Sequence, residues 1–333
     1  MSTVVEQPPD AGTSARGGSL LRAEFHRFRS RRFLQVLLGL AMLGWLAAVV
    51  IAGSQFGVPD DGDYAQAQQR LEQEVAVQEE FRRDCLADPD IPEGECPPPL
   101  TEADFQVEQF LDKAPFEFGA VGQEGAIGFA AAGAVLGFLL GATWIGAEWA
   151  TRSVVALLFW VPQRMKVMAA KLVVLLTGAA LFGVLMQLLW LAMAGILDTL
   201  AGTGEPLPAG FWGDLLPVQG RGVLLTVLTA LLGFGLANLT RNTGAALGAG
   251  FVYFAVLETA SHIFRPSWEP WLLTNNAAGL IAPGGFPVPV PSSGPTGFTE
   301  YTITNLQAGV YLGTVSAVVV GIGLVLFARR DMQ

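Results

Sequence analysis

Side chains that could do chemistry are few in this 333-residue chain. Its two histidines, His26 and His262, cannot build a metal site of several imidazoles. The three lysines, Lys113, Lys166 and Lys171, each follow a residue other than glycine, so the sequence lacks the phosphate-binding loop of ATPases. No serine elbow motif accompanies His262. We therefore expect no catalytic residue, no cofactor and no metal, and we predict that the chain is not an enzyme.

Glu258 and His262 are the exception, because they lie four residues apart within a mainly apolar stretch. This spacing places them on one face of a helix, and ionisable side chains inside a membrane are candidates for function. Two interpretations stay open. The two residues form an interfacial hydrogen-bonded pair near the outer end of their span, or they serve as a proton relay or substrate contact.

Cys85 and Cys96 are the only cysteines. Their spacing is not a zinc pattern, and no histidine accompanies them. A disulfide between them would close a short loop and add on the order of 2–3 kcal/mol of local stability. Two free thiols are the alternative.

The elements that position these residues follow from composition. Hydrophobic residues make up 52% of the chain and charged residues 14%, well below the roughly 25% of soluble domains. Apolar runs of about 20 residues cover the hydrocarbon core of a bilayer, so we predict an all-α, polytopic membrane helix bundle of six spans. The expected order is a disordered tail (1–18), an interfacial amphipathic helix (19–32), span one (33–53), an extracytoplasmic acidic insertion (54–124), span two (125–147), a cytoplasmic region (148–170), span three (171–197), an outer loop (198–220), span four (221–240), span five (242–264), an outer re-entrant or interfacial region (265–304) and span six (305–328).

The net charge of −10 has a local origin, because residues 54–122 hold seventeen of the twenty-nine acids. No basic stripe with interleaved aromatic residues occurs, so we expect no nucleic acid partner. We expect two short helices, over 64–84 and after Thr101, which the cysteine pair would join into a small helical cap.

The positive charges predict the topology. Thirteen of the nineteen lysines and arginines lie in the two termini and in the segments that share their side of the membrane. Positive residues are enriched on the cytoplasmic side. We therefore predict a multi-pass protein of the inner (plasma) membrane with both termini in the cytoplasm.

The stretch between spans two and three is an apolar segment too short to span, ended by a proline and followed by basic residues. It would lie at the cytoplasmic surface and offer an apolar ridge, 154–161, to a partner. A membrane-surface helix without a partner is the alternative. Its candidate contact residues are Glu148, Thr151, Leu157, Leu158, Pro162 and Arg164.

These residues carry a resemblance. An acid, a small residue and threonine, then two leucines, Pro-x-Arg and a lysine that opens the next span resemble the cytoplasmic loop of permease subunits of type-two ABC exporters. The N-terminal interfacial helix, the six spans, the insertion after the first span and the C-terminal Phe-Ala-Arg-Arg-Asp are similar to that family as well. One departure is Ala150 before Thr151, where glycine is common in the family.

The resemblance implies a bacterial permease that exports a substrate using ATP hydrolysis by a separate subunit. Its partners would be a cytoplasmic ABC ATPase subunit, a second permease copy or paralogue, and membrane lipid. The loop would contain the helix that docks on the ATPase, with Glu148 and Arg164 as coupling contacts. The alternative is a non-transporting scaffold or sensor whose acidic outer domain binds a ligand.

Overall fold

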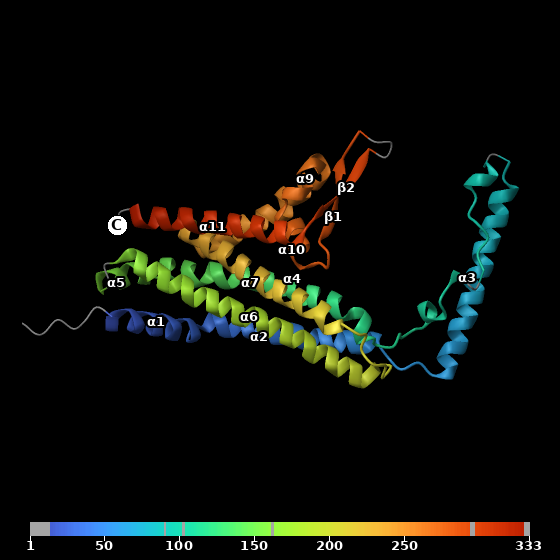
Figure 1. Ribbon diagram of the computed structural model, residues 1–333, viewed down its shortest axis with the longest axis horizontal. Coiled ribbons are helices and arrows are strands. Elements are labelled where there is room, and N and C mark those ends of the chain that lie inside the picture. The colour runs from blue at the N-terminus through green and yellow to red at the C-terminus, as the bar shows by residue number, and fades with distance from the viewer. Residues whose placement is uncertain (1–13, 90, 102–103, 161–162, 294–296, 330–333) are drawn as a thin grey trace, which may run out of the picture. The chain divides into compact units, whose positions relative to one another are not determined.

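The computed structural model describes residues 14–89, 91–101, 104–160, 163–293 and 297–329. Within these residues, helices account for most of the chain, and six helical stretches are long and apolar enough to cross a membrane (Figure 1). The predicted all-α membrane bundle is thus confirmed. The six stretches are α2 (Arg32–Gln55), α4 (Phe118–Ala150), α6 (Arg164–Ala201), α7 (Phe211–Thr240), the interrupted stretch Thr243–Phe264 and α11 (Asn305–Arg329).

Several of these helices extend beyond the predicted spans. Helix α4 begins at Phe118 rather than at 125, and α7 begins at Phe211 rather than at 221. The sequence criterion was a run without charge, whereas backbone hydrogen bonding continues past Glu124, Asp214 and Arg221. The outer loop predicted over 198–220 therefore shrinks to the residues between α6 and α7.

The fifth span is interrupted. It consists of α8 (Thr243–Val252), a π-helical turn η4 (Tyr253–Glu258) and α9 (Thr259–Phe264). The side chain of Asn242 caps the start of α8 by accepting a hydrogen bond from the Ala245 amide at 3.1 Å. A π-helical turn inserts extra backbone into the helix and is often found at functional sites. It changes the direction in which the residues after it project.

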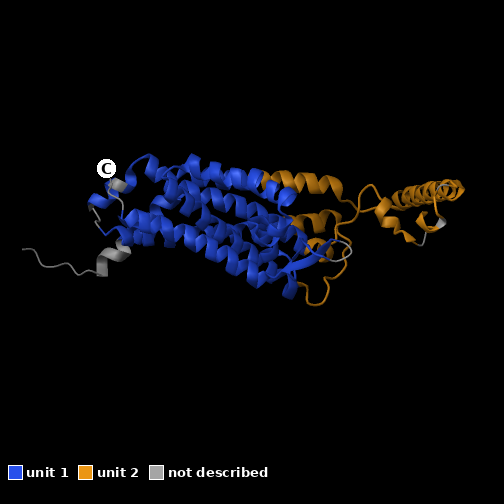
Figure 2. Ribbon diagram, turned by 90° about the horizontal axis from the view of Figure 1, so that it is seen from above, with its two compact units in different colours: residues 1–42, 123–190, 212–333 blue, residues 43–122, 191–211 orange. Residues whose placement is uncertain are grey.

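The chain divides into two compact units (Figure 2). The first comprises residues 1–42, 123–190 and 212–333, and the second comprises residues 43–122 and 191–211. The main hydrophobic core of the first unit joins α2, α4, α6, α7, α8 and α11 with two further helices, α1 (Ser14–Arg29) and α5 (Ser153–Trp160). Most apolar side chains of α2 and of the fifth span are not buried, as expected of helices that face lipid or another protein.

Glycines allow α4 and α7 to approach closely. A Cβ atom added at Gly141 would lie 1.8 Å from the carbonyl oxygen of Ala230, and one added at Gly137 would lie 2.6 Å from that of Thr226. In the reverse direction, a Cβ at Gly233 would meet the carbonyl of Phe138 at 2.2 Å. Small residues promote such contacts between membrane helices.

Replacing Gly141 by alanine is therefore expected to lower the free energy of unfolding by about 1–3 kcal/mol, the usual effect of overpacking. The measurement is thermal unfolding of the detergent-purified protein. Gly128→Ala is the matched control, because it lies on the same helix with no other atom within 4 Å of the added Cβ. Equal unfolding temperatures for the two variants would contradict the close helix contact.

The region after the fifth span contains two short helices and a hairpin. They are the 3-10 helix η5 (Pro266–Trp271), α10 (Leu273–Ile281), and the antiparallel strands β1 (Phe286–Pro291) and β2 (Phe298–Ile303). The prediction of short pieces is compatible with the helices, but it missed the hairpin. Proline alternates with Phe286, Val288 and Val290 in β1. Proline cannot donate to a ladder, yet a strand with a single partner tolerates it where no donor is needed.

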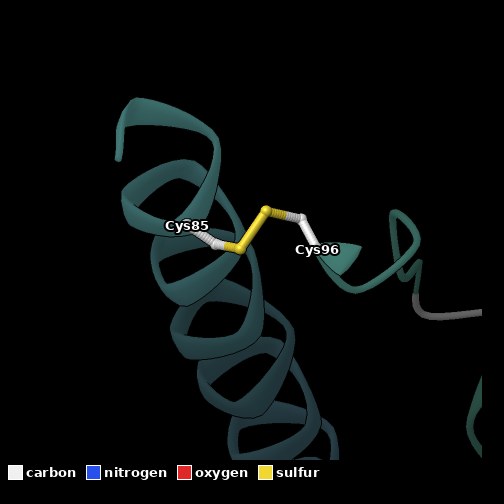
Figure 3. Close-up of a disulfide and its surroundings, with 2 residues drawn as sticks. All are labelled: Cys85 and Cys96. Atoms are coloured by element: carbon white, nitrogen blue, oxygen red, sulfur yellow. A yellow bond between two sulfur atoms is a disulfide. The ribbon is translucent and has the colours of Figure 1, made fainter. Parts of the chain in front are cut away.

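The acidic insertion lies in the second unit. The helix expected over 64–84 is present there, whereas the described residues after Thr101 form only a 3-10 turn in place of the second expected helix. One 27-residue helix, α3 (Asp61–Ala87), is followed by the 3-10 turns η1 (Glu93–Glu95) and η3 (Val107–Phe110). Asp60 and Asp63 form a reciprocal capping box at the start of α3. A disulfide joins Cys85, near the end of α3, to Cys96 just after η1 (Figure 3).

An ion pair joins Arg70 of α3 to Asp112, which follows η3 in the insertion. Arg70 donates to both carboxylate oxygens of Asp112 at 2.8 Å and to the Phe110 carbonyl at 3.0 Å. The hydrogen bonds from Arg70, together with its positive charge, lower the pKa of Asp112. The pair therefore contributes to stability above the ordinary aspartate pKa, and this contribution is lost as the pH falls through the lowered value.

Candidate coupling site

The predicted contact residues surround the turn that ends α4 and begins α5. The Thr151 hydroxyl donates to the Ala147 carbonyl at 2.9 Å and lies 3.1 Å from the Ser153 hydroxyl. Arg152 then adopts a left-handed backbone conformation (φ 55°), which ends α4. Thr151 thus caps carbonyl groups of the helix end, and its side chain is exposed.

Helix α5 is eight residues long, and its described side chains range from fully buried to highly exposed. Val154 is fully buried in the core of the first unit, and Leu158 packs partly buried against the same core. Leu157 is half-buried. Phe159 is 85% exposed, the highest value among the large apolar side chains that the structure describes. An apolar helix of this length cannot cross a bilayer, so its exposed face must meet lipid or a partner.

Arg164 is the first residue of α6, and its guanidinium lies 3.5 Å from the carbonyl oxygen of Ala328 near the end of α11. The side chain is half-buried. Pro162, the remaining predicted contact, lies outside the described residues. The structure thus places Arg164 at the start of α6, next to the last residues of α11.

Glu148 does not lie on the surface, in contrast to the predicted direct contact with a partner. It is 2% exposed, and its two carboxylate oxygens accept from Arg31 at 2.6 Å and from Lys171 at 2.7 Å. Lys171 is itself fully buried and donates to Glu24 of α1 at 2.7 Å. The physical reason is that two cations draw the carboxylate inward, Arg31 from the residue just before α2 and Lys171 from α6.

These four residues form a charge-balanced cluster, which we call the ionic cluster: Glu24, Arg31, Glu148 and Lys171. It joins α1, the start of the first span, the end of α4 and the start of α6. Two buried carboxylates face two cations, and Arg27, half exposed, adds a third cation at 3.2 Å from Glu24. Buried charges are stable only when they are paired in this way.

Trp144 forms the apolar side of the ionic cluster. The Arg31 guanidinium carbon lies 4.9 Å from the centroid of the indole, and the Lys171 nitrogen lies 5.3 Å from it. Both distances are within the range of cation–π attraction. Phe28 packs edge-on against the same indole, with ring centroids 5.0 Å apart. The ring thus contacts both cations of the cluster.

Helix α1 (Ser14–Arg29) overlaps the expected N-terminal amphipathic helix (19–32), but it begins within the segment predicted as a disordered tail (1–18). The buried side chains are Glu24 and Phe28, whereas Leu21 and Phe25 are 40% and 45% exposed. The ionic cluster explains this orientation, because Glu24 must reach Lys171. Leu21 and Phe25 stay available for a lipid surface.

Glu258 and His262 do not bond to each other, so the predicted hydrogen-bonded pair is wrong. Glu258 accepts from the Thr274 amide at 3.0 Å and makes a second, short contact with the Thr274 hydroxyl. His262 Nδ1 lies 2.6 Å from Glu269. The π-helical turn that ends at Glu258 and the packing of η5 and α10 give each residue its own partner.

In the part of the chain that the structure describes, no three His, Cys, Asp or Glu side chains gather as they would around a metal ion. Comparisons of the chain with protein-family models, with curated proteins and with solved structures found no match. The geometry of the site therefore carries the functional argument.

Proposed function

We propose that this chain is the membrane-spanning permease subunit of an ABC exporter, driven by a separate cytoplasmic ATPase. The observation that carries the proposal is α5. A short apolar helix, anchored by Val154 and presenting Phe159 outward between two spans, is suited to docking in a groove of another protein. The six apolar stretches are compatible with a transport role.

The ionic cluster supports a role for this end of the bundle in transmitting force. A push on α5 would reach α4 through the turn at Thr151 and α6 through the short connection before Arg164. Glu148 and Lys171 tie these two helices to α1. In the proposed mechanism, Glu148 acts through the cluster and does not touch the ATPase itself.

The proposed orientation places both termini, α5 and the ionic cluster in the cytoplasm of the cell, with α3 outside. The distribution of arginine and lysine supports this topology. Two such subunits, as a homodimer or with a paralogue, would form the export pathway between them. The disulfide between Cys85 and Cys96 is in keeping with an oxidising compartment around α3.

The test is purification of the tagged full-length chain from its native host in mild detergent. Mass spectrometry then identifies the proteins that accompany it, and an ATP hydrolysis assay follows on the eluate. We expect a P-loop ATPase and hydrolysis activity. A pure homomer without hydrolysis activity would contradict the proposal.

Arg164→Glu places an acid at the start of α6, beside the proposed docking helix. A change at the rim of an interface costs roughly 1 kcal/mol, so we expect about fivefold less co-purifying ATPase activity per permease. Lys166→Glu is the control, an exposed cation two residues away on the same helix. Equal recovery of the ATPase with Arg164→Glu and with the unmodified chain would exclude Arg164 as a contact.

The second candidate, a scaffold or sensor, is favoured by the exposed face of α3. Phe81 and Val77 lie one turn apart and are 62% and 58% exposed on a helix rich in acids. Such a face is suited to a ligand or partner outside the membrane. The same purification separates the two candidates, because a sensor would be recovered without an ATPase.

A further inference from the structure

A cavity lies at the end of the fifth span where α9 ends, near Phe264. It has a volume of about 350 Å³ and is formed by η4, α9 and η5. This volume is near the lower end of the range for ligand pockets, which limits an occupant to a small molecule or group. The lining residues are Tyr253, Leu257, Glu258, Ser261, Trp268, Trp271 and Leu272.

Three aromatic side chains line this cavity. Tyr253, Trp268 and Trp271 contribute three of its seven lining residues. Trp268 and Trp271 are 56% and 62% exposed, so they stand at the opening of the cavity. The Tyr253 hydroxyl accepts from the Leu273 amide at 3.2 Å, and Tyr311 donates to the Trp271 carbonyl at 2.6 Å. These bonds hold the cavity wall in place before any ligand arrives.

A carboxylate completes the cavity. Glu258 is only 4% exposed, yet it is one of the seven residues that line the cavity. Its hydrogen-bond partners are Thr274 and the Tyr253 hydroxyl, and both of these residues are neutral. Among the described residues, no lysine, arginine or histidine lies within salt-bridge distance of it. A buried carboxylate requires a compensating positive charge or a proton.

Glu269, a second buried carboxylate in the same region, has a basic side chain as a partner. It is 7% exposed, it pairs with His262 at 2.6 Å, and it accepts from the Asn275 side chain at 2.6 Å. It does not line the cavity. Of these two buried carboxylates, Glu258 is thus the one that has no basic side chain as a partner and the one that lines the cavity.

We propose that this cavity binds a small organic cation bearing an alkylated ammonium group, with Glu258 as the counter-charge and Tyr253, Trp268 and Trp271 as the aromatic cage. Aromatic rings around a carboxylate attract quaternary ammonium groups through cation–π and charge interactions. The group could arrive as a free cation or as the head group of a lipid. The site needs only this chain, so it stands whether or not an ATPase partner is found.

The test is equilibrium binding of radiolabelled choline to the full-length protein in nanodiscs of phosphatidylglycerol, a lipid without an ammonium group. We expect saturable binding, and weaker binding of 3,3-dimethylbutan-1-ol, the uncharged analogue of choline, as a competitor. Glu258→Gln should weaken choline binding about tenfold or more. Trp268→Ala and Trp271→Ala should each weaken it about two- to fivefold, because both rings are partly exposed.

Two controls accompany these variants. Glu300→Gln removes an exposed carboxylate on β2 of the same unit and should leave binding unchanged. Thermal unfolding of each variant shows whether it keeps its fold, and the exposed Trp268 provides a variant that does not disturb the core. Absence of saturable choline binding, or equal competition by the uncharged analogue, would overturn the proposal. So would unchanged affinity in a folded Glu258→Gln protein.

A further arm distinguishes the two sources of the cation. In nanodiscs of phosphatidylcholine, a site that takes lipid head groups would show strongly reduced binding of free choline, because the lipid occupies it. A site for free cations would bind choline equally in both lipids. Either result supports an ammonium site, provided that Glu258→Gln weakens the binding seen in phosphatidylglycerol by about tenfold or more.

Discussion

Replacing Lys171 by methionine is expected to lower the free energy of unfolding by about 3–5 kcal/mol. The lysine is fully buried and bonds at 2.7 Å to both Glu24 and Glu148. Without it, the two buried carboxylates would keep only Arg31 and Arg27 as partners, and both of these cations are partly exposed. Much of the repulsion and desolvation of the carboxylates would then be uncompensated. The measurement is thermal and chemical unfolding of the purified chain, followed by circular dichroism.

Lys166→Met is the matched control, because it removes a lysine from the same helix at an exposed position. It should unfold like the unmodified protein. Glu24→Gln combined with Lys171→Met should be more stable than Lys171→Met alone, because the double variant removes one of the stranded charges. If Lys171→Met and Lys166→Met unfold alike, the ionic cluster does not stabilise the bundle.

The spans were predictable because the bilayer imposes a simple rule on length and charge. Mainly apolar runs of about 20 residues identified all six stretches, including the fifth, which carries Glu258 and His262. The rule failed at the helix ends, where Asp198, Asp214 and Arg221 lie within helices. A charged residue can continue a helix after it leaves the hydrocarbon core, so an absence of charge underestimates helix length.

The ionic cluster was not predictable in the same way. Glu24 and Lys171 are 147 residues apart, and no local pattern links them. A signal was nevertheless present, because Lys171 opens an apolar run and Glu24 follows Leu21 on the expected membrane-facing helix. Charges at such positions require partners. Matching them across the chain needs the packing of α1 against α6, which a single sequence does not contain.

Glu258 illustrates a different failure. Its spacing from His262 would place both on one face of a regular helix, but the π-helical turn Tyr253–Glu258 interrupts that regularity. Of the residues that do contact them, Glu269 lies in the proline-containing η5, and Thr274 lies near the start of α10. The sequence thus identified the residues that matter but not their partners.

The second large prediction concerns Phe159, which lies on α5, the proposed docking helix. An aromatic side chain that is 85% exposed has no packing role within the described part of this chain. Large aromatic residues at the centre of interfaces commonly contribute 2 kcal/mol or more. Phe159→Asp is therefore expected to reduce the ATPase that co-purifies with the permease about thirtyfold, while thermal unfolding of the permease itself stays unchanged.

Phe264→Asp is the control for this variant, because Phe264 is 75% exposed at the end of α9, the end of its span opposite α8. It should leave the association unchanged if ATPase binding depends on α5. If α5 instead rests on the membrane surface without a partner, both aspartate variants will recover equal amounts of ATPase. A selective loss with Phe159→Asp would assign α5 to the ATPase groove, since the two changes add the same charge to the same type of exposed side chain.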